Sequence, residues 1–396
     1  YGILLLLLIY VVFKYTAQRG LDTSLDESKS KYKVAHWIQE VARSIVSFKL
    51  SGKTSHALDK NDTLVVGYLN AREGHFRVLV LQFIQMIGFK VLVTGGLLLI
   101  GGLLVLNQEM NIGQFVAAEI IILLVINSVE KLILGLETFY DLLTSLEKMG
   151  QVVDKELEPQ EGEKPFMENQ SFTIELSDIS YSVPEPKREI ISHLDLTITP
   201  NCTILLRGKS GSGKNTLLRI IAGILEPDSG GVYVNGVSLK GMNLNYYRSH
   251  LGQSLPEESP FEGTILNNIT FGDKDTTNEQ VYWALDKVGL TEFVKKQPDG
   301  LNTVLYPEGK QIPHTISKKI VLARSIVRKP KLLILKDPLD QFNSEEADRI
   351  LNFLSDSSNG WALLVVSEND KWIKKCSRII TMDKGRIINE IEGKDA

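Results

Sequence analysis

The sequence predicts an all-α transmembrane helical domain (partial) followed by an α/β domain with a glycine-rich loop. Two apolar runs of membrane-spanning length occur in the first 153 residues, GKSGSGKNT follows the apolar strand TILLR, and strands alternate with helices after residue 171. Such alternation is typical of α/β folds with a largely parallel sheet. We therefore expect three parts: residues 1–153, an acidic and proline-bearing linker at 154–170, and residues 171–396.

The composition excludes some classes of partner. The chain has 396 residues, with 44 Lys and Arg against 48 Asp and Glu, and a net charge of −4. The basic residues form no stripe, so we expect no nucleic-acid partner. The two cysteines, Cys202 and Cys376, lie far apart in the sequence and suggest neither a disulfide framework nor a metal site.

The first apolar run, residues 1–13, is too short to cross a membrane, because a hydrocarbon core of about 30 Å needs about 20 residues. We expect it to be the second half of a membrane helix that begins outside this sequence. Lys14 and Arg19 follow directly, which places this end on the cytoplasmic side by the positive-inside rule.

The next stretch, residues 16–77, is polar but keeps helical spacing of apolar residues, with a predicted break near Ser51 and Gly52. Residues 81–106 and 112–136 are each long enough to span. In the first, Lys90 either snorkels or faces a cavity. In the second, we expect Glu119 to lie near the outer interface.

The glycine-rich loop predicts nucleotide binding. Glycines let the backbone bend tightly and approach phosphates, and the helix that follows offers unpaired N–H groups to them. A Lys at the end of the loop supplies a charge for the β- and γ-phosphates, but Asn stands where the motif has the Ser or Thr that binds Mg²⁺. The predicted ATP-binding residues of the loop are Gly208, Gly211, Ser212, Gly213, Lys214, Asn215 and Thr216.

Two membrane spans, long helical extensions, a linker and a phosphate-loop domain together resemble the ATP-binding-cassette (ABC) exporters, over essentially the whole chain. The α/β part then resembles an ABC nucleotide-binding domain. The resemblance implies a subunit that couples ATP binding, with or without hydrolysis, to export of a substrate such as a peptide or protein. It also implies a homo- or heterodimer with another exporter half, contact with lipid, and an inner-membrane protein whose nucleotide-binding domain is cytoplasmic.

The resemblance extends to single residues. ELSDISYSV resembles the segment that stacks on adenine, which places Tyr181 under the base. RSHLGQS resembles the glutamine loop, where Gln253 reaches Mg²⁺ and the attacking water. Asp337 stands at the position of the family's catalytic Glu, either as a base or as a metal ligand. The implied Mg²⁺ ligands are Asn215, Gln253 and Asp337, and the implied catalytic residues are Asp337 and Gln253.

Three further motifs depart from the family pattern. Lys336 replaces the Asp that holds Mg²⁺, and Glu368 replaces a His that contacts the γ-phosphate, which its carboxylate would repel. IPHTI, residues 312–316, replaces the signature L-S-G-G-Q. We therefore expect weak or absent ATP turnover. An impaired, nucleotide-gated regulatory or partner subunit without transport activity is the alternative.

Overall fold

The computed structural model describes residues 2–52, 54–165 and 172–392 of the chain. By their internal contacts the residues divide into two compact units, Tyr1–Leu157 and Glu158–Ala396. The division falls inside the predicted linker at 154–170, of which residues 166–170 lie outside the described part. The predicted domain boundaries themselves stay a prediction.

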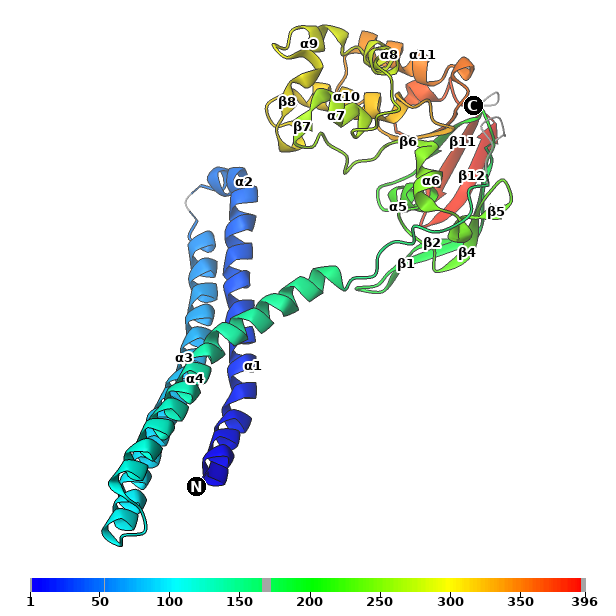
Figure 1. Cartoon of the computed structure of the whole chain (residues 1–396). Coiled ribbons are helices and arrows are strands. Elements are labelled where there is room, and N and C mark those ends of the chain that lie inside the picture. Colours follow the sequence, from blue (N-terminus) through cyan, green and yellow to red (C-terminus); the bar gives the residue numbers. More distant parts are fainter. Residues whose placement is uncertain (1, 53, 166–171, 393–396) are drawn as a thin grey trace. The chain divides into compact units, whose positions relative to one another are not determined.

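The first unit is helical (Figure 1), with α1 (Gly2–Arg43), α2 (Ile45–Leu50), α3 (His56–Leu106) and α4 (Ile112–Val153). The predicted break at Ser51 and Gly52 is confirmed, since α2 ends just before it and Gly52 has a φ of +75°. The indole of Trp37 on α1 joins the helices near this turn. It donates to the carbonyl of Ala57 at 3.1 Å, and its ring meets that of Phe48 edge-on at 6.2 Å.

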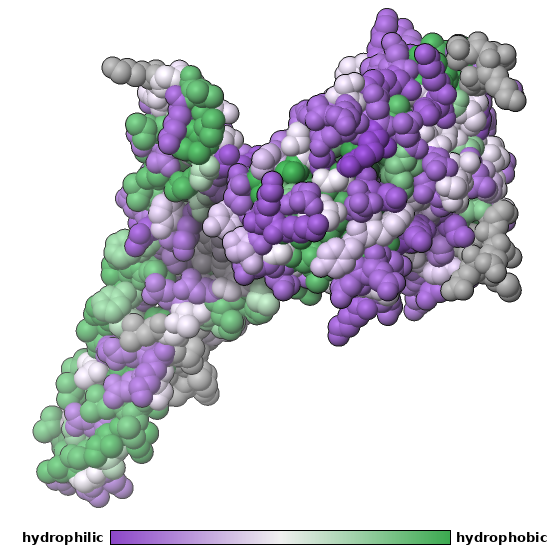
Figure 2. Space-filling view, turned by 90° about the horizontal axis from the view of Figure 1, so that it is seen from above, coloured by the Kyte–Doolittle hydropathy of each residue, from purple (hydrophilic) through white to green (hydrophobic). Residues whose placement is uncertain are grey.

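Two helices of the described part, α3 and α4, are long and apolar enough to span a membrane. They contain the predicted spans at 81–106 and 112–136. Only 17% and 6% of their most apolar windows are buried, so their apolar side chains point outward, unlike those of a core helix in a soluble protein. Figure 2 shows these apolar residues covering much of the helical unit. The predicted partial helix at 1–13 lies within α1, with residue 1 outside the described residues.

A layer of buried polar side chains ties the three long helices together. Thr23 of α1 lies 2.9 Å from Nδ1 of His75 on α3. Gln82 of α3 donates to the hydroxyl of Tyr140 on α4 at 3.0 Å. Gly20 of α1 leaves room for that ring, because an added Cβ would lie 2.5 Å from it. These hydrogen bonds satisfy polar groups that would otherwise destabilise a buried interface.

An ion pair lies within the predicted spans. The ammonium of Lys90 on α3 donates to the carboxylate of Glu130 on α4 at 2.5 Å. The two side chains keep 33% and 30% of their exposure. The sequence predicts that Lys90 either snorkels or faces a cavity, and it does not reveal this partner on the neighbouring helix. Pairing reduces the cost of placing each charge among apolar residues.

The second unit is built on a six-stranded sheet, with two smaller antiparallel sheets beside it. In spatial order the large sheet holds β12 (Arg386–Glu392), β11 (Arg378–Asp383), β3 (Thr203–Arg207), β10 (Ala362–Val366), β9 (Leu332–Lys336) and β6 (Leu251–Ser254). All neighbours in it are parallel except β11 and β12. The smaller sheets hold β2 (Arg188–Ile198), β1 (Ile174–Val183), β4 (Ser229–Val234) and β5 (Val237–Ser238), and β7 (Gly263–Thr264) with β8 (Val304–Leu305).

Helices cover both faces of the large sheet, and the strand residues alternate between two cores. Leu332 and Ile334 of β9 pack in the core that contains α5, whereas Leu333 and Leu335 pack in the core that contains α8, α10 and α11. We call the first of these the α5 face. The helices of the unit are α5 (Lys214–Ile221), α6 (Leu244–Ser249), α7 (Ile265–Thr270), α8 (Asn278–Val288), α9 (Thr291–Lys295), α10 (His314–Ile326) and α11 (Ser344–Leu354).

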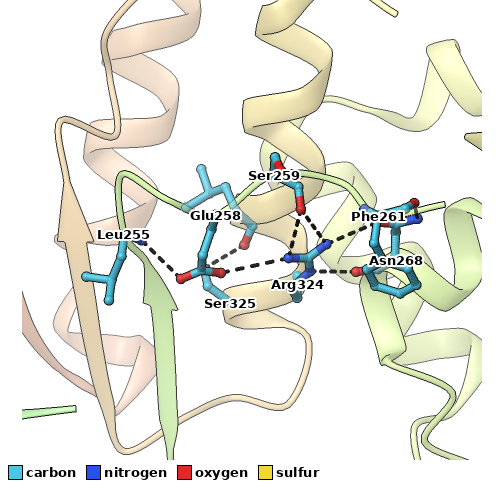
Figure 3. A network of polar contacts seen from close by, with 8 residues as sticks. Leu255, Glu258, Ser259, Phe261, Asn268, Arg324 and Ser325 are labelled. Atoms are coloured by element: carbon cyan, nitrogen blue, oxygen red, sulfur yellow. Dashed lines mark hydrogen bonds and ion pairs between the residues drawn. The ribbon is translucent and has the colours of Figure 1, made fainter. Parts of the chain in front are cut away.

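A buried guanidinium fastens the loop after β6 to α10 (Figure 3). Arg324 of α10 donates to the carbonyl of Asn268 at 2.7 Å and to its side-chain oxygen at 3.0 Å, and lies 3.8 Å from Glu258. The rings of Phe261 and Phe271 stack 5.6 Å apart, and the guanidinium lies against both of them. This network fixes the course of the segment that leaves the candidate site.

Part of the predicted linker is not free. Glu158 forms two hydrogen bonds of 2.6 Å with Arg248 of α6, and this pairing lowers the pKa of the Glu158 carboxyl. The N–H of Glu163 donates to the carbonyl of Gly241, and the N–H of Asn243 donates to that of Glu163. Residues 158–163, which we call the strap, therefore belong to the second unit.

Candidate functional site

The glycine-rich loop lies between β3 and α5 and needs glycine at two positions. Gly208 has a φ of +144°, and an added Cβ there would lie 2.2 Å from the carbonyl of Met382. Gly213 has a φ of +99°, and an added Cβ would lie 2.9 Å from the carbonyl of Ile190. Both positions combine a left-handed backbone with a close neighbour, which glycine alone tolerates. Strand, loop and helix thus have the order that the sequence predicts.

Lys214 begins α5 and folds back over the loop. Its ammonium donates to the carbonyls of Gly208 and Lys209, the latter at 3.0 Å, and to the hydroxyl of Ser212 at 3.3 Å. Burial lowers the pKa of Lys214, while the nearby carboxylate of Glu368 opposes this change. Gly213 caps α5 without a side-chain hydrogen bond, so the first N–H groups of the helix are available to an anion.

The other predicted loop residues are distributed around this lysine. Gly211 has a φ of +83° and open space beside its Cα, Ser212 is buried, and Asn215 is exposed. Thr216 is half-buried on α5. The loop therefore presents backbone N–H groups and one ammonium, which suits phosphate oxygens.

Tyr181 lies on β1, opposite Ile191 of β2. The side chain of Ile191 in turn lies against the loop, 3.1 Å from the position that a Cβ of Gly213 would take. Tyr181 is half-buried. Its predicted place beside the nucleotide-binding loop is consistent with this register.

Gln253 and Lys336 occupy the carboxyl ends of β6 and β9, both on the α5 face. Lys336 follows Leu332 and Ile334 in the strand alternation, so it projects from that face. Gly252 faces the opposite side, where its added Cβ would meet the carbonyl of Ser325 on α10, so Gln253 also projects from the α5 face. The buried Oε1 of Gln253 has no hydrogen-bond partner among the described residues.

Asp337 follows β9 with a left-handed φ of +45°, and its N–H donates to the carbonyl of Val366 at 2.8 Å. Burial raises the pKa of this carboxyl, and the nearby Asp340 adds to the effect, while Lys336 opposes it. Asp337 and Lys336 line a hollow of about 300 Å³ together with His314, which starts α10. One residue of the predicted signature segment, 312–316, thus lines the same hollow as the end of β9.

Glu368 stands at the position of the family's γ-phosphate-contacting His, which we call the switch position, and its surroundings are not evident from the sequence. Glu368 lies after β10, and its carboxylate is 3.6 Å from Nε of Arg207, the last residue of β3. Arg207 also pairs with Asp370 at 3.1 Å. Arg207 and Glu368 line an open hollow of about 610 Å³ beside Gly208. The sequence carries one signal for this pair, the arginine directly before the first glycine of the loop. Because β10 is parallel to β3, the residues at the carboxyl ends of both strands lie at the same edge of the sheet.

The donor set does not fit a divalent cation. Mg²⁺ prefers carboxylate and water oxygens, and it needs its ligands free of competing positive charge. Here the α5 face carries the amide of Gln253 and the ammonium of Lys336, and Asn215 at the loop offers a further amide. Asp337 is the one carboxylate of the predicted set. Among the described residues, no group of three His, Cys, Asp or Glu side chains is arranged to hold a metal ion.

Comparison with known proteins supports the architecture. Residues 191–340 match the family model described as "ABC transporter". This part of the chain is therefore similar to the ABC transporters. The chain is 25% identical, over 96% of its length and 64% of the relative's, to a putative export ATP-binding/permease protein of Rickettsia bellii. It is also 28% identical to an ATP-dependent lipid A-core flippase of Bordetella avium, over 62% of this chain and 42% of the flippase.

Other ABC relatives match a shorter part of the chain. An ABC multidrug transporter MDR2 of Trichophyton interdigitale is 32% identical over 59% of this chain, which spans only 18% of that relative's length. A solved bacterial Atm1-family ABC exporter with ATP bound shares the fold of the whole chain, with a TM-score of 0.86, 16% identity, and coverage of 100% of this chain and 69% of that one. The predicted fold class, a helical membrane part fused to an ABC nucleotide-binding part, is confirmed.

Proposed function

We propose that this chain is the ATP-binding half of an ABC exporter, in which nucleotide binding at Gly208–Thr216 is coupled to transport across a membrane. The observation that carries the proposal is the loop itself. It combines two obligatory glycines, a lysine folded over the loop carbonyls, and a helix whose N-terminus has no side-chain cap. In the proposed complex Lys214 contacts the β- and γ-phosphates and Tyr181 stacks on the adenine.

The assembly and location are part of the same proposal. We expect a dimer with another exporter half, homo- or heteromeric, in the inner membrane with residues 171–396 in the cytoplasm. The relatives carry names for multidrug, lipid and general export. Peptide or protein remains our proposed substrate class. The segment near residues 48–56 is proposed to couple the Gln253 loop to the membrane part.

We further propose that turnover by this chain is weak or absent. Hydrolysis of ATP depends almost entirely on positioned charges around the γ-phosphate. Lys336 inverts the charge at one of those positions, and Glu368 places a carboxylate where the family has an imidazole. Gln253 and Asp337 remain the proposed catalytic residues. Asn215, Gln253 and Asp337 are the Mg²⁺ ligands that the resemblance implies, but as a set they do not fit the ion. Asp337 has one methylene fewer than Glu, and burial raises the pKa of its carboxyl.

The test uses the purified full chain in lipid nanodiscs, with ATP affinity measured calorimetrically and phosphate release measured in the same preparation. We expect ATP binding that Lys214→Ala abolishes or weakens at least about tenfold, because a charge-assisted contact to phosphate is lost. We expect phosphate release near that of Lys214→Ala. Absence of ATP binding by the unmodified chain would refute the proposal, and turnover well above that of Lys214→Ala would refute the weak-turnover part.

A further inference from the structure

The position of Lys336 determines which charges surround the phosphate site. Its strand, β9, lies between β10 and β6, and Lys336 is in register with Val366 of β10. The alternation of β9 directs the side chain to the α5 face, where α5 begins with Lys214. The ammonium therefore occupies the region where the family's aspartate would hold Mg²⁺.

Neighbouring groups make this region suited to an ammonium. Gln253 on β6 is in register with Ile334, two residues before Lys336 on the same face. The two side chains therefore project from the same face of neighbouring parallel strands, and a long side chain such as Lys can span the gap between them. The unpartnered, buried Oε1 of Gln253 is an acceptor and needs a donor. An N–H group of lysine meets this need, and so does a water molecule.

The opposing carboxylate is already paired. Glu368, which would otherwise repel the γ-phosphate, lies 3.6 Å from Arg207 and has its charge partly balanced. Positive charge from Lys214 and Lys336 is thus left facing the loop. The two ammonium groups repel each other, and this repulsion contributes to lowering the pKa of Lys214. A bound polyphosphate would relieve this repulsion, and a divalent cation in the same place would add to it.

We propose that the site binds a nucleoside triphosphate in its metal-free form, with the Lys336 ammonium as counter-ion to the β- and γ-phosphates in place of Mg²⁺. This inference rests on the proposed function, because it concerns the same nucleotide. Lys336 neutralises phosphate charge without offering the Lewis acid or the metal-bound water that hydrolysis requires. The site then holds nucleotide as a ligand and not as a substrate.

The experiment measures ATP affinity of the full chain in nanodiscs, once in excess EDTA and once in excess Mg²⁺, for the unmodified chain, Lys336→Asp and Lys336→Met. We expect the unmodified chain to bind in EDTA at least as tightly as in Mg²⁺. The ATP affinity of Lys336→Met in EDTA should be about tenfold lower than that of the unmodified chain, because one charged contact is removed. Lys336→Asp should bind about tenfold more weakly in EDTA than in Mg²⁺, because a carboxylate restores a metal site.

The outcomes separate the two proposals. Binding by the unmodified chain that falls tenfold or more in EDTA overturns the inference and leaves the proposed function intact. If the unmodified chain binds no ATP in either buffer, and so does not differ from Lys214→Ala, the proposed function is overturned and the inference with it. The comparison of the unmodified chain in the two buffers needs no variant, so it stands even if a variant fails to fold. Circular dichroism of each variant identifies such a failure.

Discussion

Arg207, at the end of β3, lies 3.6 Å from the carboxylate of Glu368, which follows the parallel neighbour β10. The pairing joins the residue before the glycine-rich loop to the residue at the switch position. Glu368 keeps 66% of its side-chain exposure and Arg207 keeps 29%, so solvent screens the pair and its energy is modest. Its importance lies in the sign of the charge that faces the bound phosphates.

The first prediction concerns this pair. Arg207→Ala should weaken ATP binding about two- to fivefold, because the freed carboxylate of Glu368 repels the phosphates across a solvent-screened distance. Adding Glu368→Gln to that variant should restore the affinity. Asp370→Asn is the matched control, since Arg207 keeps its contact with Glu368. Calorimetric titration measures all four proteins, and an unchanged affinity in Arg207→Ala would show that Glu368 does not face the nucleotide.

The sequence predicted those features that depend on local pattern. The spans at 81–106 and 112–136, the break at Gly52 and the strand, loop and helix around Lys214 each follow from hydropathy, glycine position or strand length. The pairing of Arg207 with Glu368 depends instead on which strands are neighbours, and the two residues are 161 positions apart by their numbers, 368 minus 207. The same reason hides the ion pair between Lys90 and Glu130.

The predicted linker shows a different reason. Its acidic and proline-bearing composition is typical of a free connection, and that composition does not reveal that Glu158 has a partner. Arg248 lies on α6, which the sequence places 90 positions away. A charged residue in a linker is ambiguous until its surroundings are known, because solvent and a guanidinium satisfy a carboxylate equally well.

The second prediction is that Arg324 stabilises the second unit strongly. Arg324→Met should lower the free energy of unfolding by about 2–4 kcal/mol, because the buried carbonyl of Asn268 loses its donor and the carboxylate of Glu258 loses its counter-charge. Arg328→Met is the control. Arg328 is more exposed and pairs with Asp273 at 3.0 Å. Its replacement should lower the free energy of unfolding by less than about 1 kcal/mol. Denaturant unfolding of the full chain, followed by tryptophan fluorescence, measures both; equal effects would contradict the assigned role.

The third prediction is a pH-dependent release of the strap. Arg248 holds the pKa of Glu158 below its usual range, so the stabilisation is complete above the unfolded-state pKa of about 4.3 and is lost as the pH falls through the lower folded-state pKa. We therefore expect the amides of Glu163 and Asn243 to lose hydrogen-exchange protection below about pH 4.3, after correction for intrinsic rates.

Glu158→Gln provides the control for the strap. The amide cannot titrate, so protection of the same amides should be weaker at neutral pH and should show no change in the acidic window. Protection that falls equally with pH in the Gln variant would mean that another group governs the release. Because Glu158 keeps 42% of its side-chain exposure, the loss should be partial.

The fourth prediction concerns the ion pair between the two candidate spans. Lys90→Met leaves Glu130 without its partner among apolar side chains, and should destabilise the chain by about 1–3 kcal/mol. The exchange of charges, Lys90→Glu with Glu130→Lys, should recover most of that loss, because the attraction across α3 and α4 is restored. Lys131→Met is the matched control, since Lys131 is exposed and neighbours Glu130 in sequence. Thermal unfolding in nanodiscs measures the three, and a charge exchange as unstable as Lys90→Met would show that the pair does not hold the helices together.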